Sequence, residues 1–269
     1  MGFMYKFHKT INDQSKIELV DSKELFPLRF GKYCNTSHIF NRNKTADLEI
    51  YLLSKVGQKI VLKDPKSTAG KSIRILNVTQ DKSVIFIGEQ AINKFISNEF
   101  IQKESIYIEE FVSQHSQIAS ISPTGLNTVR VITLIDKTGH ATLIGSVFRI
   151  SVDCPIDNYS AGNLAAEVDP VNGVVITGGI RKRSACDIYH EIHPITGAKI
   201  KGFQLPFWDE VKTIVLKAAY IVPEVRTIGW DVAITDNGPL LIEGNSQWNK
   251  DTWQIPAGYG KKKMLEGLI

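Results

Sequence analysis

The feature that most constrains the fold is a pair of apolar runs near the C-terminus, Ile228–Thr235 and Leu240–Glu243. They flank the segment Asp236-Asn237-Gly238-Pro239, whose residue types favour tight turns. Apolar runs on both sides of a turn predict an antiparallel hairpin inside a larger sheet. Each run also carries an acid, Asp231 in the first and Glu243 in the second. A buried carboxylate needs a compensating partner, so these two acids are candidates for a functional site.

The length of the turn decides whether the two acids meet. A three-residue loop at 236–238 places Asp231 directly opposite Glu243, with side chains ~5 Å apart. A two-residue turn at Asn237-Gly238 would instead put them on opposite faces of the sheet. Asn245 lies two residues beyond Glu243 and therefore projects from the same face. Two carboxylates and an amide oxygen are ligands that Mg²⁺ accepts, and the apolar neighbours favour this metal site over a hairpin with solvated charges.

Repulsion between the two apposed acids leads to an expectation about stability. Removing either charge, as in Asp231→Asn or Glu243→Gln, relieves that repulsion in the protein without metal. We therefore expect both variants to fold with equal or higher thermal stability while losing metal-dependent activity.

Periodicity elsewhere indicates alternating strands and helices. The predicted helices are 16–25, 45–56, 90–100 and 208–221. The other predicted strands are 60–63, 73–78, 84–87, 105–112, 128–135, 141–150 and 174–176. Antiparallel strands with a few helices predict an α+β fold, with a smaller lobe and N-terminal segment at 1–112 and a larger lobe with the metal site at 113–269.

Composition excludes several classes of protein. The chain has 269 residues, of which 43% are hydrophobic, so it can bury a core. A net charge of +4, spread along the sequence, does not indicate a nucleic-acid-binding protein. Three cysteines without paired spacing argue against a disulfide framework, and no apolar run is long enough for a membrane span. The expectation is a soluble cytoplasmic protein.

A second candidate site lies at Lys63 and the small polar residues that follow it. Gly70-Lys71-Ser72 imitates the end of a phosphate-binding P-loop. That motif needs a glycine where this chain has Pro65, and a helix where residues 73–78 predict a strand. A glycine-containing hairpin loop can still cover phosphates with its backbone N–H groups, with Lys63 aimed at them. On the residues alone, an ordinary surface hairpin is the other interpretation.

Charged residues also occur inside two further apolar strands. Glu109 and Glu110 precede Phe111-Val112 at the end of a predicted strand. Arg130 and Arg149 lie within runs rich in valine and isoleucine. A buried arginine needs an anion or an acid as a partner, which leaves a substrate role and a structural salt bridge open for Arg149.

The ordered set of these motifs resembles the ATP-grasp superfamily. In detail it is similar to the sugar-transfer-associated ATP-grasp family, which is tied to cell-surface polysaccharide biosynthesis. The similarity covers about residues 12–254. The segments that carry it are Leu126-Asn127-Thr128-Val129-Arg130, Asp157-Asn158-Tyr159, His193-Pro194-Ile195-Thr196-Gly197, Gly229-Trp230-Asp231-Val232-Ala233 and Glu243-Gly244-Asn245.

The resemblance implies a role for each matching residue. It implies two α+β lobes with mostly antiparallel sheets that clamp ATP. Lys63 matches a lysine that contacts the nucleotide phosphates, and Lys16 takes the place of a first phosphate lysine, although Asn12-Asp13-Gln14-Ser15-Lys16 departs from the usual motif. The residues matching the mobile loop over the phosphates are Ser67, Thr68, Ala69, Gly70, Lys71 and Ser72, and those matching the adenine hinge are Glu109, Glu110, Phe111 and Val112.

The resemblance also implies the metal ligands and the reaction. Asp231, Glu243 and Asn245 match magnesium ligands, with two Mg²⁺ ions expected and Mn²⁺ as an alternative. Arg130 matches an arginine suited to the transferred phosphate, so the catalytic candidates are Arg130, Lys63 and Arg149. The family chemistry is ADP-forming ligation of a small-molecule carboxylate to an amine through an acyl phosphate. Sugar-linked substrates and association with polysaccharide-assembly enzymes are compatible with it.

Three alternatives remain open from the sequence. A sugar or small-molecule kinase would use the same ATP site. A non-catalytic nucleotide-binding partner of a glycosyltransferase would bind ATP without turnover, which the intact acidic set argues against. A basic RNA-binding module would need a concentration of charge that this chain does not show.

Overall fold

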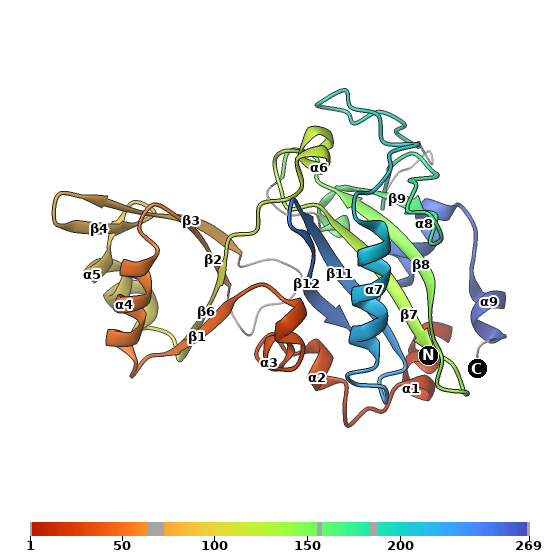
Figure 1. Cartoon of the computed structure of the whole chain (residues 1–269), viewed down its shortest axis with the longest axis horizontal. Helices are drawn as coiled ribbons and strands as arrows, with labels where there is room; N and C mark the ends of the chain where they lie inside the picture. Colours follow the sequence, from red (N-terminus) through yellow and green to blue (C-terminus); the bar gives the residue numbers. More distant parts are fainter. Residues whose placement is uncertain (1, 64–72, 155–157, 183–187, 268–269) are drawn as a thin grey trace. The chain divides into compact units, whose positions relative to one another are not determined.

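The computed structural model describes residues 2–63, 73–154, 158–182 and 188–267. The chain divides into two compact units (Figure 1). The larger unit consists of residues 1–34 and 113–269, and the smaller unit of residues 35–112. Each is built around its own sheet with helices packed against it, so the α+β fold class predicted from the sequence is confirmed.

The larger unit contains a six-stranded antiparallel sheet in its described part. Its strands are β7 (Thr128–Ile135), β8 (Ala141–Ile150), β9 (Leu164–Val168), β10 (Ile180–Arg181), β11 (Thr227–Thr235) and β12 (Gly238–Asn245). Their order in the sheet is β10-β9-β8-β7-β11-β12, so β12 is an edge strand. The predicted strand bounds of β7 and β8 agree with the structure, and those of β11 and β12 differ by one or two residues.

Helices cover both faces of this sheet. On one face α7 (Trp208–Ala219) buries Val211 and Val215 against residues such as Val131 and Phe148, and α6 (Ser116–Ile121) joins the same core. On the other face α1 (Phe3–Ile11) and α8 (Lys250–Ala257) pack against alternate residues of the same strands. Both faces of the sheet are therefore buried along much of its length, and a polar side chain on it needs a specific partner.

The smaller unit holds the second sheet. Its strands, in the order β1-β6-β2-β3-β4-β5, are β1 (Ser37–Asn41), β6 (Ser105–Glu110), β2 (Lys59–Lys63), β3 (Arg74–Asp81), β4 (Val84–Ile87) and β5 (Gln90–Ala91). Two helices, α4 (Thr45–Ser54) and α5 (Ile92–Phe95), and a π-helical turn at Ile96–Phe100 lie with it. Leu48, Leu52, Phe95 and Phe100 close its core.

The remaining helical elements are short. They are α2 (Glu18–Asp21), α3 (Leu25–Phe30), α9 (Lys262–Glu266) and the 3₁₀ turns Gly31–Tyr33 and Tyr159–Ala161. No helix in the described part of the chain has the length and apolarity to cross a bilayer.

Three sequence predictions about local structure are wrong. Residues 16–25 form two short helical segments instead of one, because Ser22 at the end of α2 is extended. Residues 90–100 are not helical throughout. Gln90 and Ala91 form strand β5, because they pair with Ile87 and Phe86 of β4, and the helical part begins at Ile92. Residues 174–176 make only isolated bridges, with Val168 and Gln204 as partners.

The N-terminal segment also groups differently from the predicted division at 1–112. Residues 1–34 belong to the larger unit, because Val20, Phe26 and Phe30 are buried in its core. The chain passes from the smaller to the larger unit between Val112 and Ser113.

Candidate functional site

The hairpin formed by β11 and β12 brings the two predicted acids together. Asp231 pairs directly with Glu243, which confirms the predicted pairing. The turn is shorter than predicted, because Thr235 pairs with Gly238 instead of Pro239. A β-bulge between Asp231 and Val232 shifts the register by one residue, so Val232 pairs with Leu241 while Asp231 pairs with Glu243. The bulge thus compensates for the shorter turn. Asn245 pairs with Gly229 one step farther along the same face.

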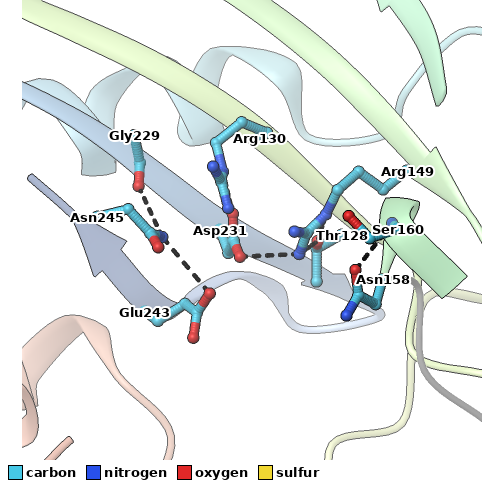
Figure 2. A network of polar contacts seen from close by, with 9 residues as sticks. All are labelled: Thr128, Arg130, Arg149, Asn158, Ser160, Gly229, Asp231, Glu243 and Asn245. Carbon is cyan, nitrogen blue, oxygen red and sulfur yellow. Dashed lines mark hydrogen bonds and ion pairs between the residues drawn. The ribbon is translucent and has the colours of Figure 1, made fainter. Parts of the chain in front are cut away.

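Asp231 is fully engaged by two arginines from the neighbouring strands β7 and β8. Arg130 Nε donates to one carboxylate oxygen of Asp231, and Arg149 Nη2 donates to the other at 2.8 Å (Figure 2). The Asp231 side chain is only 2% exposed. Burial alone raises the pKa of Asp231, but the two guanidinium charges outweigh it and hold this pKa well below its usual range. Asp231 is therefore a buried, ionised carboxylate.

Thr128 fixes the orientation of Arg149. Its Oγ1 accepts hydrogen bonds from Arg149 Nε at 3.0 Å and from Arg149 Nη2 at 2.6 Å. Thr128 lies two residues before Arg130 on the same strand, so both side chains project from one face. The sequence analysis missed this role, although the spacing of two residues was a signal for it.

Glu243 and Asn245 lie beside this cluster on the edge strand. Asn245 Nδ2 donates to the Gly229 carbonyl at 3.2 Å and lies 3.4 Å from Glu243 Oε1. Surrounding protein raises the pKa of Glu243 to about 7 by desolvation, and the negative charge of Asp231 acts in the same direction. The Glu243 side chain still reaches solvent. A charged ligand can therefore approach Glu243 from outside.

The residues present fit a hard divalent cation. Both of the described contacts of the Asn245 amide use Nδ2, which leaves Oδ1 as the atom that can ligate. A cation next to Glu243 would favour its ionised form and offset its repulsion with Asp231. Within the described residues no group of three or more His, Cys, Asp or Glu side chains is arranged to hold a metal. The candidate donors here are the Glu243 carboxylate and the Asn245 amide oxygen, with the charge of Asp231 beside them.

The predicted nucleotide residues of the smaller unit lie on neighbouring strands β2 and β6. Lys63 Nζ forms an ion pair with Glu109 Oε2 at 2.7 Å, and both side chains are 13% exposed. The pairing of β2 with β6 brings the two residues together, since Lys63 lies opposite Tyr107 and Val61 opposite Glu109. The predicted phosphate loop, Ser67 to Ser72, lies outside the described residues.

The other predicted nucleotide residues differ in their surroundings. Glu110 Oε1 accepts a hydrogen bond from Lys55 Nζ at 2.5 Å. The ring of Phe111 is partly exposed and lies 5.1 Å from Lys59 Nζ, and Val112 ends the unit. Lys16 belongs to the larger unit, in an exposed turn where its backbone N–H bonds to the Asp13 carbonyl. The assignment of all these residues to a nucleotide stays a prediction.

Solved ATP-grasp structures have a similar fold. The ATP-grasp ligase PsnB in complex with a minimal precursor matches with a TM-score of 0.52 and 14% identity, over 96% of this chain and 62% of PsnB. D-alanine–D-alanine ligase from Bacillus anthracis matches with a TM-score of 0.52 and 13% sequence identity, over 96% of this chain and 68% of the ligase. N5-carboxyaminoimidazole synthetase from Staphylococcus aureus in complex with ADP matches with a TM-score of 0.53 and 8% sequence identity, over 90% of this chain and 48% of the synthetase. This chain therefore spans from about half to about two thirds of their lengths.

A family model gives the more specific match. No curated protein sequence matches the chain. The family described as sugar-transfer associated ATP-grasp matches residues 3–268, nearly the whole chain. This match includes both units and every residue of the clusters described above. The chain belongs to the sugar-transfer-associated ATP-grasp family.

Proposed function

We propose that this protein is an ATP- and Mg²⁺-dependent carboxylate–amine ligase of cell-surface polysaccharide or sugar-conjugate biosynthesis. The observation that carries the proposal is the polar cluster of the larger sheet. Asp231, Arg130 and Arg149 form its buried part, and Glu243 and Asn245 its solvent-facing part. Paired arginines beside two carboxylates are suited to a reaction in which a phosphoryl group and a divalent cation are held together.

Glu243 and Asn245 would hold the cation in this proposal. Their side chains project from the same side of the hairpin, where Glu243 is exposed and Asn245 is partly exposed. Asp231 would contribute mainly through charge, because both of its oxygens already accept hydrogen bonds from arginine. When bound, magnesium would neutralise negative charge on the phosphate oxygens. Two ions, or Mn²⁺ in place of Mg²⁺, are compatible with this donor set.

Lys63 and the residues at the end of β6 would bind the nucleotide. Lys63 Nζ carries a positive charge at a partly buried position, held by Glu109. Charge-assisted contacts from such a lysine to phosphate oxygens are stronger than neutral hydrogen bonds. The backbone after Glu110 leaves the sheet, so its N–H and C=O groups would be available to an adenine ring.

The proposed chemistry proceeds in two steps. A carboxylate oxygen of the acid substrate attacks the terminal phosphorus of ATP, the bond to the bridging oxygen breaks, and ADP leaves. The amine nitrogen then attacks the acyl carbon, phosphate leaves with its bonding electron pair, and the amine loses a proton to solvent. Arg130 and Arg149 would stabilise charge on the phosphoryl group during transfer. The acid and the amine would be small molecules, of which one is linked to a sugar.

The experiment that tests this proposal measures products. Purified protein is incubated with ATP, Mg²⁺ and panels of uronic acids, amino acids and amino sugars. We expect ADP and phosphate to appear in step with an amide product. With the acid alone plus hydroxylamine, we expect a hydroxamate, which traps the acyl phosphate.

Other products would contradict the proposal. Formation of AMP and pyrophosphate would show attack at the α-phosphorus instead. A stable phosphorylated sugar would show a kinase. Tight ATP binding without turnover across the panels would favour a nucleotide-binding partner of a glycosyltransferase.

A further inference from the structure

The edge strand that carries Glu243 and Asn245 is covered by the N-terminal segment of the chain. Helix α2 packs against β12, and Cys34 forms a parallel bridge with Leu241. The approach is close at Gly244, where a built Cβ would lie 2.6 Å from Val20 Cγ1 and 3.0 Å from Phe26 Cε2. Residues 18–34 therefore hold the side of β12 that no other strand pairs with in the described sheet.

Asp21, the last residue of α2, holds the end of β12 by two hydrogen bonds. Asp21 Oδ1 accepts from the backbone N–H of Ser246 at 2.7 Å, and Oδ2 accepts from the Ser246 hydroxyl at 2.6 Å. Ser246 is fully buried and directly follows Asn245. Both oxygens of one carboxylate are thus committed to the residue next to a proposed cation ligand.

Asn12 holds the same residue from another direction. Its Nδ2 donates to the Ser246 carbonyl at 2.9 Å and to the Thr227 carbonyl at 3.0 Å, and its Oδ1 accepts from the Thr227 N–H at 2.9 Å. Thr227 begins β11, the strand that carries Asp231. Asn12 is buried and therefore ties the start of β11 to the end of β12.

We infer that Asp21 and Asn12 are positioning residues for the proposed cation site. Together they fix Ser246, and through it the backbone that directs Asn245 and Glu243 toward a common ligand. Without these hydrogen bonds, the end of β12 would be held only by its pairing with β11. The end of an edge strand opens locally more easily than a strand held on both sides, and such opening would change the distance between the ligands. The inference rests on the cation-binding role proposed above for Glu243 and Asn245.

The size of the expected effect follows from comparable sites. Residues that hydrogen-bond to metal ligands and orient them typically contribute about 10- to 100-fold to metal affinity. Asp21 lies near the surface and acts through one intervening residue, so we expect a loss of about tenfold, at the lower end of that range.

The test compares three variants of the whole protein. Asp21→Ala removes both hydrogen bonds to Ser246. Asp21→Asn keeps them, because an amide can accept from the backbone N–H and donate to the hydroxyl oxygen. Asp13→Ala is the matched control, since Asp13 belongs to the same segment but its carboxylate accepts hydrogen bonds from Ser15 and not from Ser246 among the described residues.

Two binding measurements serve as readouts. Mn²⁺ binding in the presence of ADP is followed by electron paramagnetic resonance, and ADP binding in EDTA is followed by calorimetry. We expect Asp21→Ala to weaken Mn²⁺ binding about tenfold while ADP affinity in EDTA stays the same. Asp21→Asn and Asp13→Ala should bind Mn²⁺ like the unchanged protein. Hydrogen exchange at residues 243–246 without metal should be faster in Asp21→Ala.

The outcomes separate this inference from the proposed function. If Glu243→Gln abolishes Mn²⁺ binding but Asp21→Ala leaves it unchanged, Asp21 is only structural and the inference is wrong. If Glu243→Gln also leaves Mn²⁺ binding unchanged, the cation site itself is wrong. If Asp21→Ala does not fold, Ser246→Ala replaces it. That variant loses one of the two hydrogen bonds and should show a smaller loss of Mn²⁺ affinity, and an unchanged affinity would overturn the inference.

Discussion

Arg130 and Asp231 lie directly opposite each other on the paired strands β7 and β11 and form a buried ion pair. The second oxygen of Asp231 accepts from Arg149, so one carboxylate pairs with two guanidinium groups. This arrangement distinguishes Asp231 from Glu243, which faces the same site, contacts the Asn245 amide and remains open to solvent. The two acids should therefore respond differently to substitution.

Asp231→Asn should lower the free energy of unfolding by about 3–5 kcal/mol, because it leaves Arg130 buried without a charged partner. Glu243→Gln should leave stability equal or raise it, because it removes a negative charge next to Asp231. Urea unfolding of both variants without nucleotide measures the difference. Equal stability of the two would contradict the geometry. From the sequence alone, both variants are expected to be at least as stable as the unchanged protein. For Asp231→Asn, the ion pairs in the structure predict lower stability instead.

Lys63→Ala should weaken ATP binding by about one to two decades, because a charge-assisted phosphate contact contributes ~1.5–3 kcal/mol. Lys71→Ala should have a smaller effect, since the likeness of Gly70-Lys71-Ser72 to a P-loop does not extend to the rest of that motif. Calorimetric titration with ATP compares the two. A dispensable Lys63 together with an essential Lys71 would mean that the phosphates lie elsewhere.

Arg130→Lys should reduce kcat by at least about tenfold while changing ATP affinity little. Lysine keeps a positive charge near Asp231 but lacks the planar fork that can contact a carboxylate and a phosphoryl oxygen together. Because the proposed contact strengthens mainly during transfer, the loss should appear in kcat. Steady-state kinetics and ATP titration on one preparation test this. A loss confined to ATP affinity would assign Arg130 to ground-state binding.

His8 should make stability depend on pH. It is buried on α1 with its ring 5.0 Å from that of Trp248, and desolvation lowers its pKa from 6.5 to about 4. The unfolded chain therefore binds a proton between pH 6.5 and 4 that the folded protein does not. Stability should fall as the pH falls through this window, by on the order of 2–3 kcal/mol at most.

Urea unfolding between pH 7 and 4 measures this dependence. His8→Phe should flatten the curve in that window, because phenylalanine does not titrate. His140→Phe, a change in an exposed turn, serves as the control and should leave the curve unchanged. An unchanged slope in His8→Phe would show that other groups cause the acid sensitivity.

The sequence by itself determined much of the local structure. Runs rich in valine and isoleucine predict β7 and β8 with their observed bounds, because both strands are largely buried and their turn residues are unambiguous. The acids at 231 and 243 stand out for the same reason, since a charge inside an apolar strand needs a partner. The order of several motifs along the chain identified the resemblance to the ATP-grasp superfamily, which no single residue could have done.

Only the tertiary structure decided which charges meet. The predicted pairing of Asp231 with Glu243 is correct, yet it depends on a bulge that the sequence does not reveal and that compensates for a shorter turn. The order of the strands then places Arg130 and Arg149 on Asp231, and the fold brings Asp21 and Asn12 to Ser246, more than 200 residues away. Periodicity reports which face of a strand is buried, whereas the partner across that face depends on contacts between distant segments, and these exist only once the chain has folded.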